Sequence, residues 1–258
     1  MFYEKQPQRL RDEVRSHLPE GLEPESAIGA IVPHAGYVYS GPVAGAVYAR
    51  LKIPRVVVIL CPNHTGRGAP AALDPSDSWR TPLGDVPVDR QLAERLLALA
   101  PSLREDREAH AREHSLEVQL PFLQTRRPDV RLVPVCLGAP DLALCREVGE
   151  ALARIRAEET EPPVILASSD MNHYESRAIG RAKDDRALAR IEKLDPEGLF
   201  ETVLAEGITM CGFLPVTALL FAAREAGARS ATVVARRDSG DETGDASSVV
   251  GYAGVIVK

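Results

Sequence analysis

The sequence has 258 residues, of which 45% are hydrophobic and 26% are charged, and its formal net charge at pH 7 is −6. This composition is that of an ordinary globular protein, and it excludes wholesale disorder and collagen-like repeats. The acidic balance, without clustered lysines and arginines, argues against nucleic acid as a partner.

The first residues, MFYEKQPQRLRDEV, contain no apolar signal segment, and no run approaches the ~18 apolar residues of a membrane helix. We therefore expect a cytoplasmic protein that does not bind a membrane. The cysteines Cys61, Cys136, Cys145 and Cys211 form no C-x-x-C pair. With no export signal, they are expected to be reduced thiols.

Two β-branched runs, residues 27–33 and 55–61, end in loops marked by Pro, Gly or Asn, which is typical of buried strands. Between them, residues 40–42 (SGP) predict a helix start with a cap and a first-turn proline, followed by helical residues 43–51. This β-α-β pattern predicts parallel strands.

Helices and strands continue to alternate along the chain. The helix at 90–100 is capped by Asp89, and a later one is opened by Asp141. The other expected elements are helices at 115–126, 177–191, 196–205 and 215–226, strands at 131–137 and 164–169, and final strands, with antiparallel pairing as one option, at 231–235 and 249–257. Residues 238–245, rich in Gly and Asp, are expected to form a mobile loop.

This alternation predicts an α/β fold that spans residues 1–258 as a single domain. The expected architecture is a mostly parallel central sheet with helices on both faces.

Ligands of open α/β sheets bind beyond the carboxyl ends of the strands. Three histidines stand there: His34, His64 and His173 each follow a predicted strand. A lone histidine more often has a structural role, but three imidazoles at equivalent strand ends favour a divalent metal site.

Two further side chains are candidates at the same crevice, each with a plain structural alternative. Asp170 can orient an imidazole or exchange a proton with a substrate, or it can cap a turn. Cys211 precedes a helix whose N-terminus favours a thiolate ligand, but an isolated cysteine is more often a small buried hydrophobe. We expect the crevice to be lined by His114 and bordered by Tyr37, Tyr39, Trp79 and Tyr174.

Several other site types find no support in the sequence. It has no P-loop and no strand followed by G-x-G-x-x-G, which argues against nucleotide chemistry. It also lacks the H-E-x-x-H of zinc proteases and the G-x-S-x-G of serine hydrolases.

The motifs PHAGYVYSG, PNHTG, WRTPLGDVPVD, EHSLEVQLPFL, SSDMNHY and CGFLPVTALL follow one another along most of the chain. In this order they resemble the Memo family, including prokaryotic members described as protein B of the AmmeMemoRadiSam system. The resemblance implies a fold similar to class III extradiol ring-cleavage dioxygenases, which are non-haem iron enzymes. It also implies a radical S-adenosylmethionine protein as a partner.

The resemblance further implies a ligand set. His34, His64 and Cys211 match the positions that bind metal in Memo proteins, and Asp170 and His173 match positions that line the same pocket. Iron or copper is the implied cofactor, and zinc also suits these ligands. The dioxygenases use two histidines and a carboxylate, so Cys211 is a departure that puts ordinary ring cleavage in doubt.

The leading functional expectation is a metal-dependent redox enzyme, similar to a dioxygenase or an oxidase, acting on a small-molecule or peptide ligand. His173 would exchange protons, and Asp170 would orient it. One alternative is a non-catalytic protein that binds a peptide or a partner protein in the same crevice. Another is a zinc-dependent hydrolase, because two histidines, a cysteine and a water also suit catalytic zinc.

Overall fold

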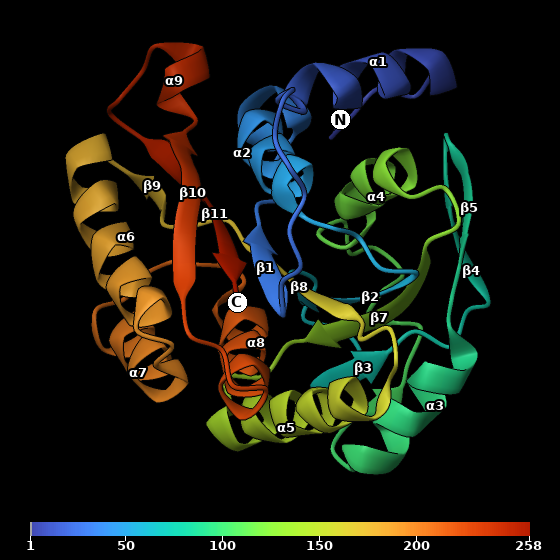
Figure 1. Ribbon diagram of the computed structural model, residues 1–258. Helices are drawn as coiled ribbons and strands as arrows, with labels where there is room; N and C mark the ends of the chain where they lie inside the picture. The colour runs from blue at the N-terminus through green and yellow to red at the C-terminus, as the bar shows by residue number, and fades with distance from the viewer. Residues whose placement is uncertain (1) are drawn as a thin grey trace.

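A mixed central sheet runs through the computed structural model, which describes residues 2–258 (Figure 1). Its strands are β1 (Gly29–Val32), β2 (Val56–Pro62), β3 (Ala71–Leu73), β6 (Arg104–Glu105), β7 (Arg131–Leu137), β8 (Val164–Ser168), β9 (His173–Glu175), β10 (Ala231–Asp238) and β11 (Val249–Val257). Within the described residues the order is β10-β11-β1-β8-β2-β7-β3-β6, and β9 pairs with β11.

The centre of the sheet is parallel and its edges are mostly antiparallel. Strands β1, β8, β2 and β7 run parallel to one another, whereas β11 is antiparallel to β1 and β10, and β3 is antiparallel to β7. The predicted α/β fold is therefore confirmed, as are the antiparallel final strands. Strands β1 and β2 are parallel as predicted, but β8 lies between them.

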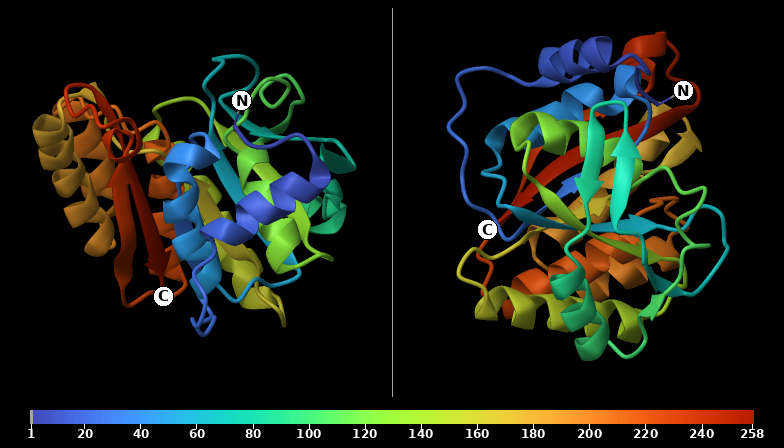
Figure 2. Two further views of the ribbon diagram at one scale, coloured as in Figure 1. Left: turned by 90° about the horizontal axis from the view of Figure 1, so that it is seen from above. Right: turned by 90° about the vertical axis from the view of Figure 1, so that its right-hand side faces the viewer.

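Helices cover both faces of the sheet (Figures 1 and 2). The helices are α1 (Pro7–His17), α2 (Tyr37–Arg50), α3 (Arg90–Leu99), α4 (Leu120–Arg126), α5 (Leu142–Glu158), α6 (Arg177–Glu192), α7 (Pro196–Ala205), α8 (Phe213–Glu225) and α9 (Gly240–Thr243). Helices α1, α2 and α4 lie on one face, and α3, α5, α6, α7 and α8 lie on the other. None of the helices in residues 2–258 has the length and apolar character needed to span a bilayer.

The parallel strands are buried on both sides because their residues alternate between two cores. In β2, Val58 and Leu60 belong to the core under α5 and α8, whereas Val57 and Ile59 belong to the core under α1, α2 and α4. Successive side chains of a strand point to opposite faces, so an unbroken apolar run such as VVVIL supplies both cores.

Helix α2 begins earlier than the sequence predicts. It starts at Tyr37, so Pro42 lies inside the helix instead of in its first turn. The ring of Pro42 removes one hydrogen bond, to the carbonyl of Val38, but Val38 is 52% exposed and its carbonyl can bond to water instead. The Ser40 hydroxyl donates to the Ala35 carbonyl, so Ser40 is not the cap of the helix.

Four other segments differ from the prediction. The expected helix at 115–126 is a 3-10 turn at Glu117–Gln119 followed by α4, and Pro121 stands in the first turn of α4, where its missing N–H costs nothing. Residues 238–245 contain the short helix α9, which the ion pair of Arg177 with Asp241 holds in place. Helix α1 and the hairpin of β4 (Ser78–Thr81) and β5 (Gly84–Pro87) were not predicted.

Candidate metal centre

His34 lies in the loop after β1, and a buried hydroxyl fixes its tautomer. Its Nδ1 is 2.9 Å from Ser168 Oγ. The Ser168 hydroxyl donates its own proton to the Ser115 carbonyl, 2.7 Å away, so it must accept the proton of His34 Nδ1. His34 Nε2 therefore carries the lone pair, which is the state that a metal ligand requires.

His64, in the loop after β2, is held by a carboxylate. Its backbone N–H donates to Glu113 Oε2 at 2.7 Å, and its Nδ1 donates to Glu113 Oε1 at 2.9 Å. Burial opposes protonation of His64, but the hydrogen bond and charge of Glu113 outweigh it and raise the pKa of His64. Burial of Glu113 is likewise outweighed by its hydrogen bonds from His64 and Ser115, which lower its pKa to about 2. The pair again leaves Nε2 of the imidazole as the free ring nitrogen.

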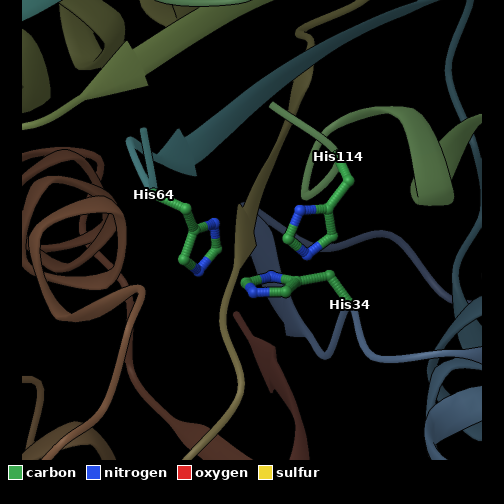
Figure 3. Close-up of side chains that lie close together, drawn as sticks. All are labelled: His34, His64 and His114. Atoms are coloured by element: carbon green, nitrogen blue, oxygen red, sulfur yellow. The ribbon is translucent and has the colours of Figure 1, made fainter. Parts of the chain in front are cut away.

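His114 completes a cluster of three imidazoles (Figure 3). Its ring stacks on that of His64 with centroids 4.9 Å apart, and the rings of His34 and His64 meet edge to face at 5.2 Å. One ring nitrogen of each histidine lies within 4.8 Å of the others. Figure 3 shows the three rings turned toward a common space. These histidines could hold a metal ion, because neutral imidazoles at this spacing suit a divalent cation.

Electrostatics favours neutral rings at two of the three positions. Burial, reinforced by the neighbouring His64 and His114, lowers the pKa of His34 well below its usual range. Burial also lowers the pKa of His114, although the charge of Glu113 acts in the opposite direction. Unprotonated rings keep a lone pair for a metal.

Cys211 adjoins the cluster through His34. Its Sγ lies 3.2 Å from His34 Nε2 and accepts the backbone N–H of Asp170 at 3.3 Å. Burial and the charge of Asp170 raise the pKa of the thiol well above its usual range. The sequence predicted His34, His64 and Cys211 as the ligands, whereas the group of possible ligand atoms that all lie within 4.8 Å of one another in residues 2–258 has His114 as its third member.

A cavity of about 590 Å³ joins these groups, and it opens at the carboxyl ends of the parallel strands. The predicted site residues that line it are His34, His64, His114, Asp170, His173, Cys211, Tyr39 and Tyr174. The structure therefore brings together most of the side chains singled out in the sequence. Tyr174 lines the cavity and is 78% exposed, so it stands at the mouth of the cavity.

Asp170 and His173 are placed differently from the expectation that one orients the other. The carboxylate of Asp170 accepts the backbone N–H of His34 at 2.8 Å, which positions the loop after β1. The Nδ1 of His173 donates instead to the carbonyl of Thr209, 2.9 Å away, and this bond leaves its Nε2 free. Burial raises the pKa of Asp170, although its hydrogen bond from His34 acts against that change.

Two expected border residues do not line this cavity. Tyr37 is buried at the start of α2, where its hydroxyl donates to the Val118 carbonyl at 2.6 Å and its ring packs in the core on that face. Trp79, on β4, contacts the ring of His110 edge to face and lines a neighbouring cavity. Both tyrosine and tryptophan were predicted from residue type and loop position alone, and these do not determine where a ring points.

Two contacts of the site had no signal in the sequence. The ring of Phe2 stacks on His114 with centroids 4.2 Å apart, and Thr209 holds His173. Both contacts join segments distant in the chain. Glu113 precedes His114 directly, and a carboxylate beside a candidate histidine is the one signal that could have indicated its role.

Comparisons with known proteins agree with this architecture. The model of the family described as Memo-like protein matches residues 1–256. A MEMO1 family protein of Pyrobaculum aerophilum is 40% identical over 99% of this chain and 95% of the relative. Another from Methanococcoides burtonii is 43% identical over the whole chain and 97% of the relative.

A similar solved structure is that of an uncharacterized protein from Escherichia coli K12. It superposes with a TM-score of 0.55 and 18% identity, and the match covers 82% of this chain and 89% of that one. This likeness concerns the fold alone. The family model and the near full-length relatives decide the assignment, and the chain belongs to the Memo family.

Proposed function

We propose that this protein is a metal-dependent oxidoreductase that binds iron or copper through His34 and His64. Cys211 and His114 are the two candidates for the third ligand. The observation that carries the proposal is the grouping of three ring nitrogens within 4.8 Å at the floor of a cavity. His34 Nδ1 is hydrogen-bonded to Ser168 and His64 Nδ1 to Glu113, which leaves the Nε2 atom of each ring as the candidate ligand.

The donor set fits a redox metal. Imidazole suits iron, copper and zinc, and a thiolate from Cys211 would favour copper(I), iron or zinc over magnesium or calcium. The raised pKa of the Cys211 thiol does not oppose this role, because a coordinating thiol is deprotonated by the metal itself. A bound iron or copper ion would supply one-electron and dioxygen chemistry.

His173 is our candidate for proton exchange with a bound ligand. It lines the same cavity as the cluster, and its bond to Thr209 fixes the ring with Nε2 free. Asp170 would act through His34, whose backbone N–H it accepts, and is therefore a positioning residue. The ligand would be a small molecule, because the cavity of about 590 Å³ is of the size that such ligands occupy.

One observation favours a second candidate, a zinc-dependent hydrolase. The contact of Glu113 with His64 is the carboxylate–histidine arrangement that often supports zinc ligands. A catalytic zinc site has three protein ligands and a water, and the cluster can supply the three ligands. The two candidates differ in metal content and in oxygen use.

The test begins with protein purified without oxygen, whose metal content is determined by elemental analysis. Iron or copper near one equivalent, with oxygen consumption in the presence of a reductant, is the result expected for an oxidoreductase. Zinc alone without oxygen consumption would favour the hydrolase. Protein that contains no iron, copper or zinc would overturn both candidate functions.

Variants identify the ligands. Cys211→Ser and His114→Ala are compared for copper(I) and iron(II) affinity, and the variant that loses affinity identifies the third ligand. Cys145→Ala is the control, because Cys145 is buried on α5 away from the cluster. His173→Ala should keep the metal and lose most oxygen consumption. Unchanged affinity in both ligand variants would contradict the proposed site.

A further inference from the structure

A second cavity of about 490 Å³ adjoins the metal centre. We call it the arginine cavity, and it is lined by residues that include Phe2, Trp79, Arg107, His110, Arg112 and His114. Phe2 and His114 also line the cavity that holds the three histidines. The stacked rings of these two residues, with centroids 4.2 Å apart, are therefore a wall common to both cavities.

The acidic groups of the arginine cavity are already engaged within the protein. Asp74 accepts from the backbone and hydroxyl of Ser76, and Glu113 accepts from His64 and Ser115. Glu117 accepts the hydroxyl of Tyr3. Each of these carboxylates thus accepts at least one hydrogen bond within the protein, and none of them forms an ion pair with Arg107 or Arg112.

Of the three arginines that line the cavity, one is paired with a carboxylate and two are not. Arg80 binds Asp85 through two hydrogen bonds, of 2.8 and 3.1 Å. Arg107 and Arg112, by contrast, have no ion pair and no side-chain hydrogen bond to any part of residues 2–258. Both are exposed at the rim of the cavity. A guanidinium without a protein partner keeps its five N–H donors for an anion, and carboxylates match its planar geometry best.

The remaining wall is aromatic. Trp79 meets His110 edge to face with ring centroids 5.8 Å apart, and Phe2 is 40% exposed. Aromatic side chains of this kind accommodate an apolar or planar molecular body. The cavity therefore combines an apolar wall with a cationic rim.

We propose that the arginine cavity binds a small organic carboxylate with an apolar body, held by Arg107 and Arg112 against Trp79. This cavity would receive the anionic end of the substrate, while the other end passes Phe2 and His114 toward the metal. The role in substrate binding rests on the proposed function. The anion site itself depends only on the arginine cavity.

Tryptophan fluorescence tests the site directly, because Trp79 is the only tryptophan of the sequence. Metal-free protein is titrated with 3-phenylpropanoate, and a saturable change in emission is expected. The neutral analogue 3-phenylpropanamide should bind about tenfold or more weakly, since hydrogen bonds to a charged group exceed those to a neutral one. The double variant Arg107→Ala/Arg112→Ala should lose a similar factor for the carboxylate and show no preference between the two probes.

The matched control is Arg229→Ala. Arg229 is exposed and lies just before β10, at the opposite edge of the sheet from the arginine cavity. Its backbone N–H donates to the carbonyl of Lys258, which follows Val257, the residue that pairs with Gly29. The Arg229→Ala variant should bind the carboxylate as the unmodified protein does. Equal binding of carboxylate and amide, or full binding by the double arginine variant, would overturn the proposal.

A second variant separates this proposal from the metal site. His34→Ala/His64→Ala should lose metal affinity while its metal-free form still binds 3-phenylpropanoate. If the unmodified protein binds no metal but discriminates the carboxylate, the metal proposal fails and the anion site stands. If it binds metal but does not discriminate the carboxylate, only the anion site fails.

Discussion

Glu113 accepts both the backbone N–H and the Nδ1–H of His64, at 2.7 and 2.9 Å, so a single buried carboxylate fixes the position and the tautomer of one imidazole. The same carboxylate accepts the backbone N–H and the hydroxyl of Ser115. These bonds connect the loop after β2 to the segment that carries His114. Glu113 therefore positions His64 in the cluster through hydrogen bonds and is not itself one of the candidate metal ligands.

Replacement of Glu113 by glutamine should weaken metal binding. The amide cannot accept both bonds of His64 as strongly, and partners of this kind typically change metal affinity by about 10- to 100-fold. Affinity is measured by competition with a chelator of known affinity, and circular dichroism checks the fold. Glu108→Gln is the control, because Glu108 is exposed in the same region. Wild-type affinity in Glu113→Gln would show that Glu113 does not support the metal.

Asp184 should make the stability of the protein depend on pH. This side chain is 3% exposed, and burial raises its pKa from 3.8 to about 6, although a hydrogen bond from the Asn172 backbone and the charge of Arg236 oppose the change. The folded state therefore binds the proton more tightly than the unfolded state. The resulting stabilisation is complete below about pH 3.8 and is lost as the pH rises through about 6.

The measurement compares the unfolding free energy of the unmodified protein and Asp184→Asn between pH 4 and pH 7. The difference, unmodified minus variant, should fall by up to about 3 kcal/mol over this range, because the asparagine does not titrate. A difference that is constant with pH would contradict the raised pKa.

Two glycines in helices should respond in opposite ways to alanine. A Cβ at Gly45 would lie 1.9 Å from the carbonyl oxygen of His17, where α2 packs on α1, so Gly45→Ala forces the helices apart. We expect a loss of about 3 kcal/mol in urea denaturation. At Gly180, on α6, the Cβ would be 3.7 Å from its nearest neighbour, so Gly180→Ala should stabilise by about 0.5–1 kcal/mol. Equal effects at both positions would refute the close approach at Gly45.

The cap of α5 should be measurable in the same assay. The carboxylate of Asp141 accepts the backbone N–H groups of Ala143 and Leu144. Asp141→Ala should lower the unfolding free energy by about 1 kcal/mol, whereas Asp141→Asn, which keeps an oxygen acceptor, should be close to neutral. A large loss in the asparagine variant would assign the effect to charge instead of capping.

Much of the architecture follows from local patterns. The runs AIGAIVP and RVVVILC predict buried strands; their strand residues, Gly29–Val32 and Val56–Pro62, are almost entirely buried, and they place His34 and His64 at the same edge of the sheet. Asp89 and Asp141 cap helices where the sequence predicts, because a capping side chain bonds to backbone groups two or three residues away.

Contacts between segments distant in the chain do not follow from local sequence patterns. The sequence determined the parallel centre of the sheet, the edge where the candidate site residues gather and most residues of the cavity. Only the tertiary structure decided that β8 lies between β1 and β2, that Thr209 instead of Asp170 holds His173, and that Phe2 stacks on His114. Periodicity and capping are set by neighbours within a few residues, whereas strand order and ring contacts depend on how whole apolar faces pack together.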